Sequence, residues 1–282
     1  MLGSAGMDSI NKVALIQAEK LGVLDPTTLM SDTTAQEAMI PYPNEVGLMK
    51  RFSDLVSKNI KKLGGKFSKI KNKIKEKVSA IKGLARRSHL FAKTREQKQK
   101  IGKKLYHTTI GLQKLVQDCL SEENSMKSKA GKEVQRLSDL MAILLPQILH
   151  FLKTSFVAPK KIIHLQMPEL YSIVRGKAGK SVEFGLKWGV NHVDGFIQGF
   201  LIKNGEHASD KKFCMEALDQ HKDLFETVPE IYGFDRGGYS KANIKKAAKL
   251  GVKHVGIAPA GKASWAVSEK MSESIRRERV QV

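Results

Sequence analysis

The segment EIYGFDRGG, Glu230 to Gly238, constrains the fold of this chain more than any other stretch. Its apolar residues 231–234 have the composition of a strand, and Asp235 stands where they meet a glycine turn. In open α/β sheets, ligands and metals collect at the carboxyl ends of strands. Asp235 is therefore a candidate for a catalytic or metal-binding role. The alternative is that it caps a turn or pairs with Arg236.

The residues that follow predict how this strand continues into a larger fold. Ser240 has the character of an N-cap for a helix over residues 243–250, and Gly251 that of its C-cap. Residues 252–258 then form a second buried apolar run. The order strand, acid, helix, strand predicts an α/β domain.

The charge of the chain indicates its class of partner. Its 282 residues contain 49 Lys and Arg against 28 Asp and Glu, a net charge of +21. A polyanion is the expected partner, and the alternative is a solvated basic surface. Cys119 and Cys214 lie far apart and are expected to be reduced thiols without a disulfide or zinc site. Without a signal-peptide pattern or a membrane span of about 18 apolar residues, we expect a cytoplasmic protein with no membrane partner.

The N-terminal region offers a second acid near a strand. An amphipathic helix is expected over residues 9–22, followed by a β-branched run, 27–34, that predicts a short strand ending near Asp32. Asp32 is thus a second carboxylate at a strand end. The alternative is that Asp32 is the N-cap of a helix beginning at Ala35.

A basic helical region follows this strand. Lysine-rich residues 49–104 carry apolar residues three or four apart, and further helices are expected over 101–120 and 134–152, the latter with a kink at Pro146. We interpret residues 44–159 as an all-helical insertion. Its basic face is open to three interpretations: a solvated surface, contact with the DNA backbone without sequence preference, or a membrane-surface helix.

Strand patterns return after residue 160. Strands are expected over residues 161–167, 182–190 and 196–202, with Asp194-Gly195 as a hairpin turn, and a helix over 210–228 should lead to the strand before Asp235.

Several of these segments together resemble a known protein family. The run IYGFDRGGYSKANIKKAAKLGVKHVGIAP, with RGKAGKSVEFGLKWG before it and SIRRERVQV after it, resembles the catalytic region of DDE transposases of bacterial insertion sequences. That resemblance implies a ribonuclease H-like mixed sheet flanked by helices, with the basic helical insertion after the first strand. The parts expected are an N-terminal helix and first strand (1–43), the insertion (44–159) and the rest of the catalytic domain (160–282).

The resemblance also implies a site. In the family, acids at one sheet edge hold two divalent metals, and the first two acids correspond here to Asp32 and Asp235, with Mg²⁺ or Mn²⁺ as cofactor. Water, or a free 3′-hydroxyl, then attacks a phosphodiester at the ends of the element or in target DNA. DNA contacts are expected from Arg236, from Arg279, and from Arg175 and Lys177 in the loop RGKAGK; the alternative for those last two is pairing with Glu183.

The third acid of the family is missing from its expected place. That glutamate follows an arginine by four residues, and four residues after Arg279 is position 283, one past Val282. Glu278 would face another side of the helix. We therefore expect a truncated transposase copy acting on double-stranded DNA at the nucleoid, with a homodimer as one assembly. The alternative is a catalytically inactive nucleic-acid-binding remnant.

Two tyrosines could be proposed as nucleophiles in place of a metal-activated hydroxyl. Tyr232 belongs to the apolar run before Asp235, and Tyr239 follows the glycine turn. A core or turn role is expected for each.

Overall fold

The computed structural model describes residues 4–63, 66–120, 128–177, 180–202 and 209–259. The chain divides into two compact units. A sheet unit combines Met1–Glu37 with Ile173–Val282, and a helical unit comprises Ala38–Ser172. The helical unit therefore follows the first strand, and its limits are wider than the 44–159 expected for the insertion.

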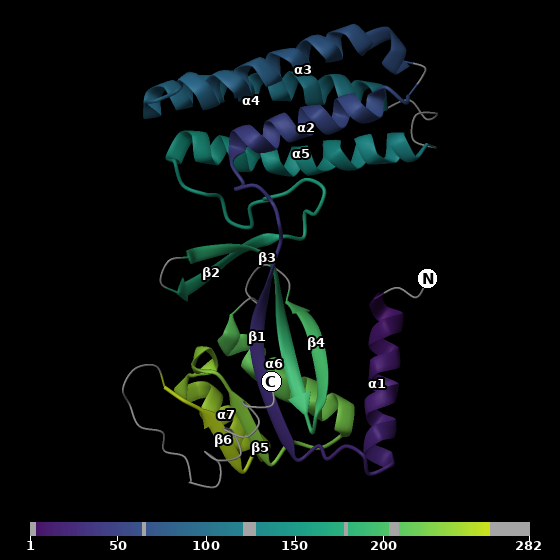
Figure 1. Ribbon diagram of the computed structural model, residues 1–282, viewed down its shortest axis with the longest axis vertical. Coiled ribbons are helices and arrows are strands. Elements are labelled where there is room, and N and C mark those ends of the chain that lie inside the picture. Colours follow the sequence, from purple (N-terminus) through teal and green to yellow (C-terminus); the bar gives the residue numbers. More distant parts are fainter. Residues whose placement is uncertain (1–3, 64–65, 121–127, 178–179, 203–208, 260–282) are drawn as a thin grey trace. The chain divides into compact units, whose positions relative to one another are not determined.

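The helical unit is built from α2 (Glu45–Ile60), α3 (Lys66–Phe91), α4 (Arg95–Leu120) and α5 (Lys129–Thr154), shown in Figure 1. Helix α3 packs on α2 and α4, and α5 packs on the same two helices. One face of each helix is apolar, and these faces share a buried core that includes Phe52, Ile81, Leu112 and Met141.

The expected strand over residues 161–167 is wrong. This segment has no regular secondary structure and belongs to the helical unit. Ile162 and Leu165 are buried in the helical core. The apolar alternation that resembled a strand is instead a connecting segment whose side chains cover the helices.

The sheet unit contains a mixed sheet of six strands. These are β1 (Thr28–Glu37), β2 (Tyr171–Lys177), β3 (Lys180–Val193), β4 (Phe196–Ile202), β5 (Ile231–Phe234) and β6 (His254–Ile257). The strand order is β2-β3-β1-β5-β6, and β4 also pairs with β3. Strand β1 is antiparallel to β3 and parallel to β5, β3 is antiparallel to β4, and β5 is parallel to β6. The predicted α/β class with a mixed sheet flanked by helices is confirmed.

Local sequence signals specify several connections in this unit. The hairpin between β3 and β4 turns at Asp194 and Gly195, whose φ angles of 45° and 82° suit an Asp-Gly pair. Helix α7 (Lys241–Leu250) begins where the Ser240 hydroxyl accepts a hydrogen bond from the Asn243 amide, at 3.0 Å. It ends at Gly251, whose φ of 105° requires glycine. The predicted turn and both predicted caps are confirmed.

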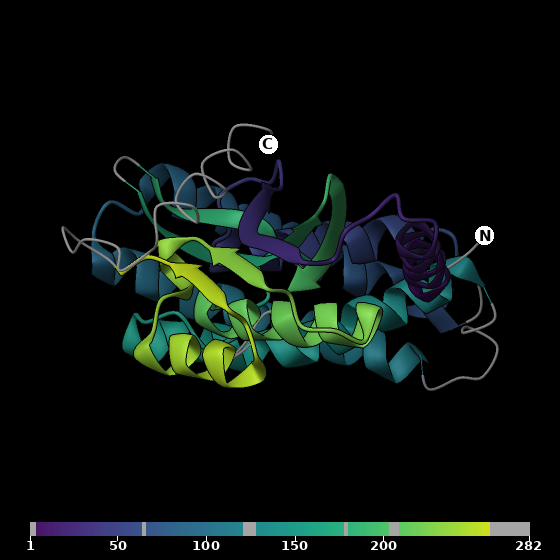
Figure 2. The same ribbon diagram turned by 90° about the horizontal axis from the view of Figure 1, so that it is seen from below.

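Helices α6 (Asp210–Phe225) and α7 lie on one face of the sheet, as Figure 2 shows. Helix α1 (Ser4–Lys20) packs on α6. The core beneath them contains Leu29 from β1, Phe213 from α6, and Tyr232 and Phe234 from β5. Consequently β1 and β5 direct these alternate residues toward α6, and their remaining residues point to the opposite face.

His221 joins α6 to the segment that enters β1. Its side chain is 2% exposed, and its ring nitrogens lie 2.9 Å from the Pro26 carbonyl oxygen and 3.2 Å from that of Thr227. Burial lowers the His221 pKa below its usual 6.5, while the two backbone carbonyls act in the opposite direction. The folded protein therefore favours neutral His221.

This shift predicts that the sheet unit loses stability as the pH falls. With a folded-state pKa below 6.5, the unfolded chain binds a proton before the folded one does, so the His221 contribution is complete above pH 6.5 and declines below it. We expect the urea midpoint, followed by tryptophan fluorescence, to decrease from pH 7 to pH 5. His221→Gln should flatten that decrease, whereas the same variant at the exposed His150 should not. An unchanged slope in His221→Gln would contradict the assignment.

Candidate functional site

Asp32 lies within β1, and not at the end of the strand as expected. Strand β1 continues five residues further, to Glu37, because residues 30–37 pair with residues 185–192 of β3. The alternative that Asp32 caps a helix beginning at Ala35 is therefore also wrong. The parallel pairing between β1 and β5, however, stops at Ser31, immediately before Asp32.

The strand register brings Asp32 and Asp235 together. Strands β1 and β5 pair in parallel from Thr28 with Ile231 through Ser31 with Phe234. The next residues along the two chains are Asp32, which is still within β1, and Asp235, which follows the end of β5. Asp235 keeps an extended backbone, with φ −68° and ψ 174°. Neighbouring strands lie about 4.8 Å apart, so these two positions bring the acids close to each other.

The two carboxylates also share a face. Ser31 and Phe234, the preceding pair, are buried on the α6 side of the sheet. Because side chains alternate along a strand, Asp32 and Asp235 belong to the opposite side. Asp32 is exposed and Asp235 is half-buried. Among the described residues, neither acid is therefore fully covered.

Short hydrogen bonds orient each carboxylate. Asp235 Oδ1 accepts from the Gly237 amide at 2.8 Å, at the start of a short 3-10 helix over Arg236–Gly238. Asp32 Oδ1 accepts from the Thr33 amide at 2.7 Å. Asp235 is thus a turn cap, as the alternative interpretation held, and it also stands beside Asp32.

Asp210, the first residue of α6, makes polar contacts beside the two acids. Asp210 Oδ1 accepts from the Thr33 hydroxyl at 2.7 Å and from Lys187 Nζ at 2.5 Å. A Cβ on Gly237 would lie 2.4 Å from Asp210 Oδ2, so the turn after Asp235 rests directly against this carboxylate. Asp210 therefore links the residue after Asp32 to the turn after Asp235.

The sequence did not predict these contacts of Asp210. The pattern Ser209-Asp210 marks a helix start, and Ser209 does cap α6 by accepting from the Lys212 amide. No sequence signal pairs Asp210 with Lys187 or Thr33, because those contacts depend on the register between β1 and β3.

The nearby tyrosine and cysteine belong to the core. The Tyr232 hydroxyl donates to the Cys214 carbonyl at 2.5 Å, and burial raises the Tyr232 pKa well above 10.0. Burial likewise raises the pKa of the Cys214 thiol to about 11. Neither group is ionised near neutral pH, so both are unsuited to act as nucleophiles. The core role expected for Tyr232 agrees with this geometry.

The basic residues expected to hold DNA have separate positions. Arg236 is exposed and directly follows Asp235. Arg175 and Lys177 lie in β2, and not in a loop as expected, because the strand extends through Lys177. Their side chains lie outside the described part of the structure, as do Arg279 and Glu278.

The two carboxylates have the chemistry of ligands for a divalent metal. Carboxylate oxygens are the ligands that Mg²⁺ and Mn²⁺ prefer, and two neighbouring carboxylates suit a shared cation. Within the described residues, no group of three or more His, Cys, Asp or Glu side chains is placed to hold a metal. Asp32 and Asp235 alone provide two carboxylates.

Comparisons with known proteins return no relative. No protein-family model, no curated protein and no solved structure matches the chain. Every helix in the described ranges is too short or too polar to cross a bilayer.

Proposed function

We propose that this chain is a ribonuclease H-like DDE transposase domain that carries out metal-dependent phosphodiester hydrolysis and strand transfer at the ends of an insertion sequence. The observation that carries the proposal is the β1–β5 register, whose last pair, Ser31 with Phe234, directly precedes Asp32 and Asp235. These acids are separated by over two hundred positions in the sequence. Two carboxylates that are distant in the sequence and meet at one sheet edge are more typical of a catalytic or metal-binding site than of structural packing.

The sheet topology supports the same proposal. A central strand, β1, lies between an antiparallel hairpin of β3 and β4 and the parallel strands β5 and β6. Helix α6 connects the hairpin to β5, and α7 connects β5 to β6. This is the connectivity expected of a ribonuclease H-like domain, with β2 as an additional strand.

In the proposed mechanism, Asp32 and Asp235 would hold Mg²⁺ or Mn²⁺. Two carboxylates this close repel each other when ionised, and a divalent cation relieves that repulsion. The bound metal would activate water or a 3′-hydroxyl and stabilise the leaving oxygen. Asp210 contacts the residue after Asp32, through Thr33, and lies against the Gly237 turn after Asp235. Arg236 contacts a DNA phosphate beside them.

Double-stranded DNA is the proposed partner, including transposon ends and target, with action in the cytoplasm at the nucleoid and a homodimer as one assembly. The net charge of +21 supports a polyanionic partner. Exposed basic residues recur along α3 and α4, including Lys71, Lys75, Arg86, Lys100 and Lys104. Such residues bind phosphates without reading bases.

The same basic helices favour a second candidate function, that of a nucleic-acid-binding protein without catalysis. Their exposed lysines need no carboxylate pair to bind DNA.

One experiment separates the two functions. Supercoiled plasmid is incubated with the full chain in Mn²⁺ or in EDTA, and both gel retardation and nicking are measured. The transposase proposal predicts retardation in both conditions and nicking only in Mn²⁺. Retardation without nicking in either condition would overturn catalysis and leave the binding function.

A further inference from the structure

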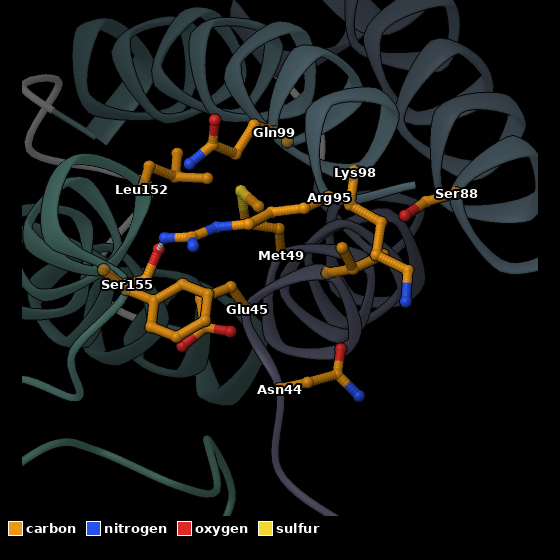
Figure 3. A pocket seen from close by; sticks show the side chains of 12 residues that line it. Asn44, Glu45, Met49, Ser88, Arg95, Lys98, Gln99, Leu152 and Ser155 are labelled. Atoms are coloured by element: carbon orange, nitrogen blue, oxygen red, sulfur yellow. Dashed lines mark hydrogen bonds between the residues drawn. The ribbon is translucent and has the colours of Figure 1, made fainter. Parts of the chain in front are cut away.

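A cavity of about 430 Å³ opens in the helical unit, where the beginnings of α2 and α4 meet the end of α5 (Figure 3). Every residue that lines it belongs to the helical unit, so it is independent of the carboxylate pair. Its lining combines apolar and basic groups: Asn44, Glu45, Val46, Met49, Ser88, Arg95, Lys98, Gln99, Gly102, Phe151, Leu152 and Ser155.

The inner wall of the cavity is apolar. Met49 is 0% exposed and Leu152 is 8% exposed. Gly102 of α4 is also buried, and a Cβ there would lie 2.8 Å from Leu152 Cδ2. A larger residue at position 102 would therefore fill part of the space. This wall suits an alkyl chain or a ring.

The opening of the cavity carries positive charge. Figure 3 shows the Arg95 side chain reaching toward Ser155, and its Nη2 donates to the Ser155 hydroxyl at 2.6 Å. Lys98 lies one turn further along α4 and also lines the opening. Both basic residues are exposed at the surface.

Glu45 also lines the cavity, but it does not neutralise the positive charge of Arg95 and Lys98. Glu45 forms an ion pair with Lys161, and the two side chains are 10% and 8% exposed. Lys161 also lies 5.7 Å from the centre of the Phe151 ring. Because Lys161 neutralises Glu45, Glu45 does not compete with a ligand for Arg95 and Lys98.

We propose that this cavity binds a small amphipathic carboxylate, with its apolar part against Met49 and Leu152 and its carboxylate on Arg95. A guanidinium has five N–H donors and holds a carboxylate through two parallel hydrogen bonds, so Arg95 can bind the ligand while it contacts Ser155. Lys98 adds long-range attraction for the same anion.

The test is calorimetric titration of the full chain with octanoate, with neutral octanamide as the matched probe. Octanoate should bind, and Arg95→Met, which keeps the apolar stem, should weaken binding at least about tenfold. Lys100→Met, an exposed change on the same helix outside the cavity, should leave the affinity within about twofold. Octanamide should bind more weakly than octanoate, with little response to Arg95→Met.

A second measurement locates the ligand. With methyl-labelled methionine, octanoate should shift the NMR resonance of Met49 and leave that of Met141, which is buried in the same core but does not line the cavity. Absence of octanoate binding, equal affinity in Arg95→Met, or equal weakening in Lys100→Met would overturn the proposal. A shift of Met141 without one of Met49 would overturn it as well.

Discussion

Asp32→Asn and Asp235→Asn are each expected to lower Mn²⁺-dependent nicking of plasmid DNA by about 10²- to 10³-fold. Each change keeps the shape of the side chain and removes one negative charge from the pair that the β1–β5 register brings together. The metal would then lose a charged ligand, and the charge it stabilises in the transition state would be left uncompensated. The measurement is the initial rate of nicking at saturating Mn²⁺.

The matched control is Asp219→Asn, an exposed acid on α6 that is not part of the pair. It should keep nicking within about twofold of the parent chain. Gel retardation should persist in all three variants, because DNA binding depends on the basic residues. Equal nicking by the parent chain and by both site variants would contradict the proposed role of the pair.

Gly189→Ala is expected to destabilise the sheet unit by about 3 kcal/mol. A Cβ on Gly189 of β3 would lie 2.1 Å from the Phe213 ring, a distance that real contacts do not reach. Phe213 is 1% exposed and packs between Phe200 and Phe234, so its ring has no space into which to retreat. The free energy of unfolding is measured with urea by tryptophan fluorescence, which does not report on the helical unit because the sequence has no Trp between residues 38 and 172.

The control for this effect is Gly199→Ala on the neighbouring strand β4. A Cβ there would lie 3.8 Å from Trp188, an ordinary contact, so the change should stay within about 0.5 kcal/mol. Combining Gly189→Ala with Phe213→Leu should cost less than the sum of the two single changes, because the smaller side chain relieves the clash. Additive costs, or a large cost at Gly199 alone, would refute the packing argument.

Local sequence signals were sufficient for much of the sheet unit. The glycine turn after Phe234, the Asp194-Gly195 hairpin and the caps of α7 each depend on a few adjacent residues, and all are present as predicted. The helices of the inserted unit were also predictable, since an apolar face with a 3.6-residue period requires no knowledge of the partner helix.

Features that depend on distant parts of the chain could not be predicted in the same way. Apolar residues 161–167 alternate like a strand, but they serve as a cover for the helical core. Strand β1 extends past Asp32 because β3 supplies a pairing partner as far as Gly185, which the local β-branched run does not indicate. Asp210 lies beside the acids only because of the register between β1 and β3, and the cavity beside Arg95 forms only where the ends of four helices meet.

Titration of the full chain with Mn²⁺, followed by the EPR signal of the free ion, tests the pairing of Asp32 and Asp235 most directly, because it requires no knowledge of the DNA sequence. A bound Mn²⁺ is expected in the parent chain and in Asp219→Asn, and that ion should be lost in both Asp32→Asn and Asp235→Asn. Retention of the ion in either of those two variants, or its absence from the parent chain, would show that Asp32 and Asp235 do not share a metal.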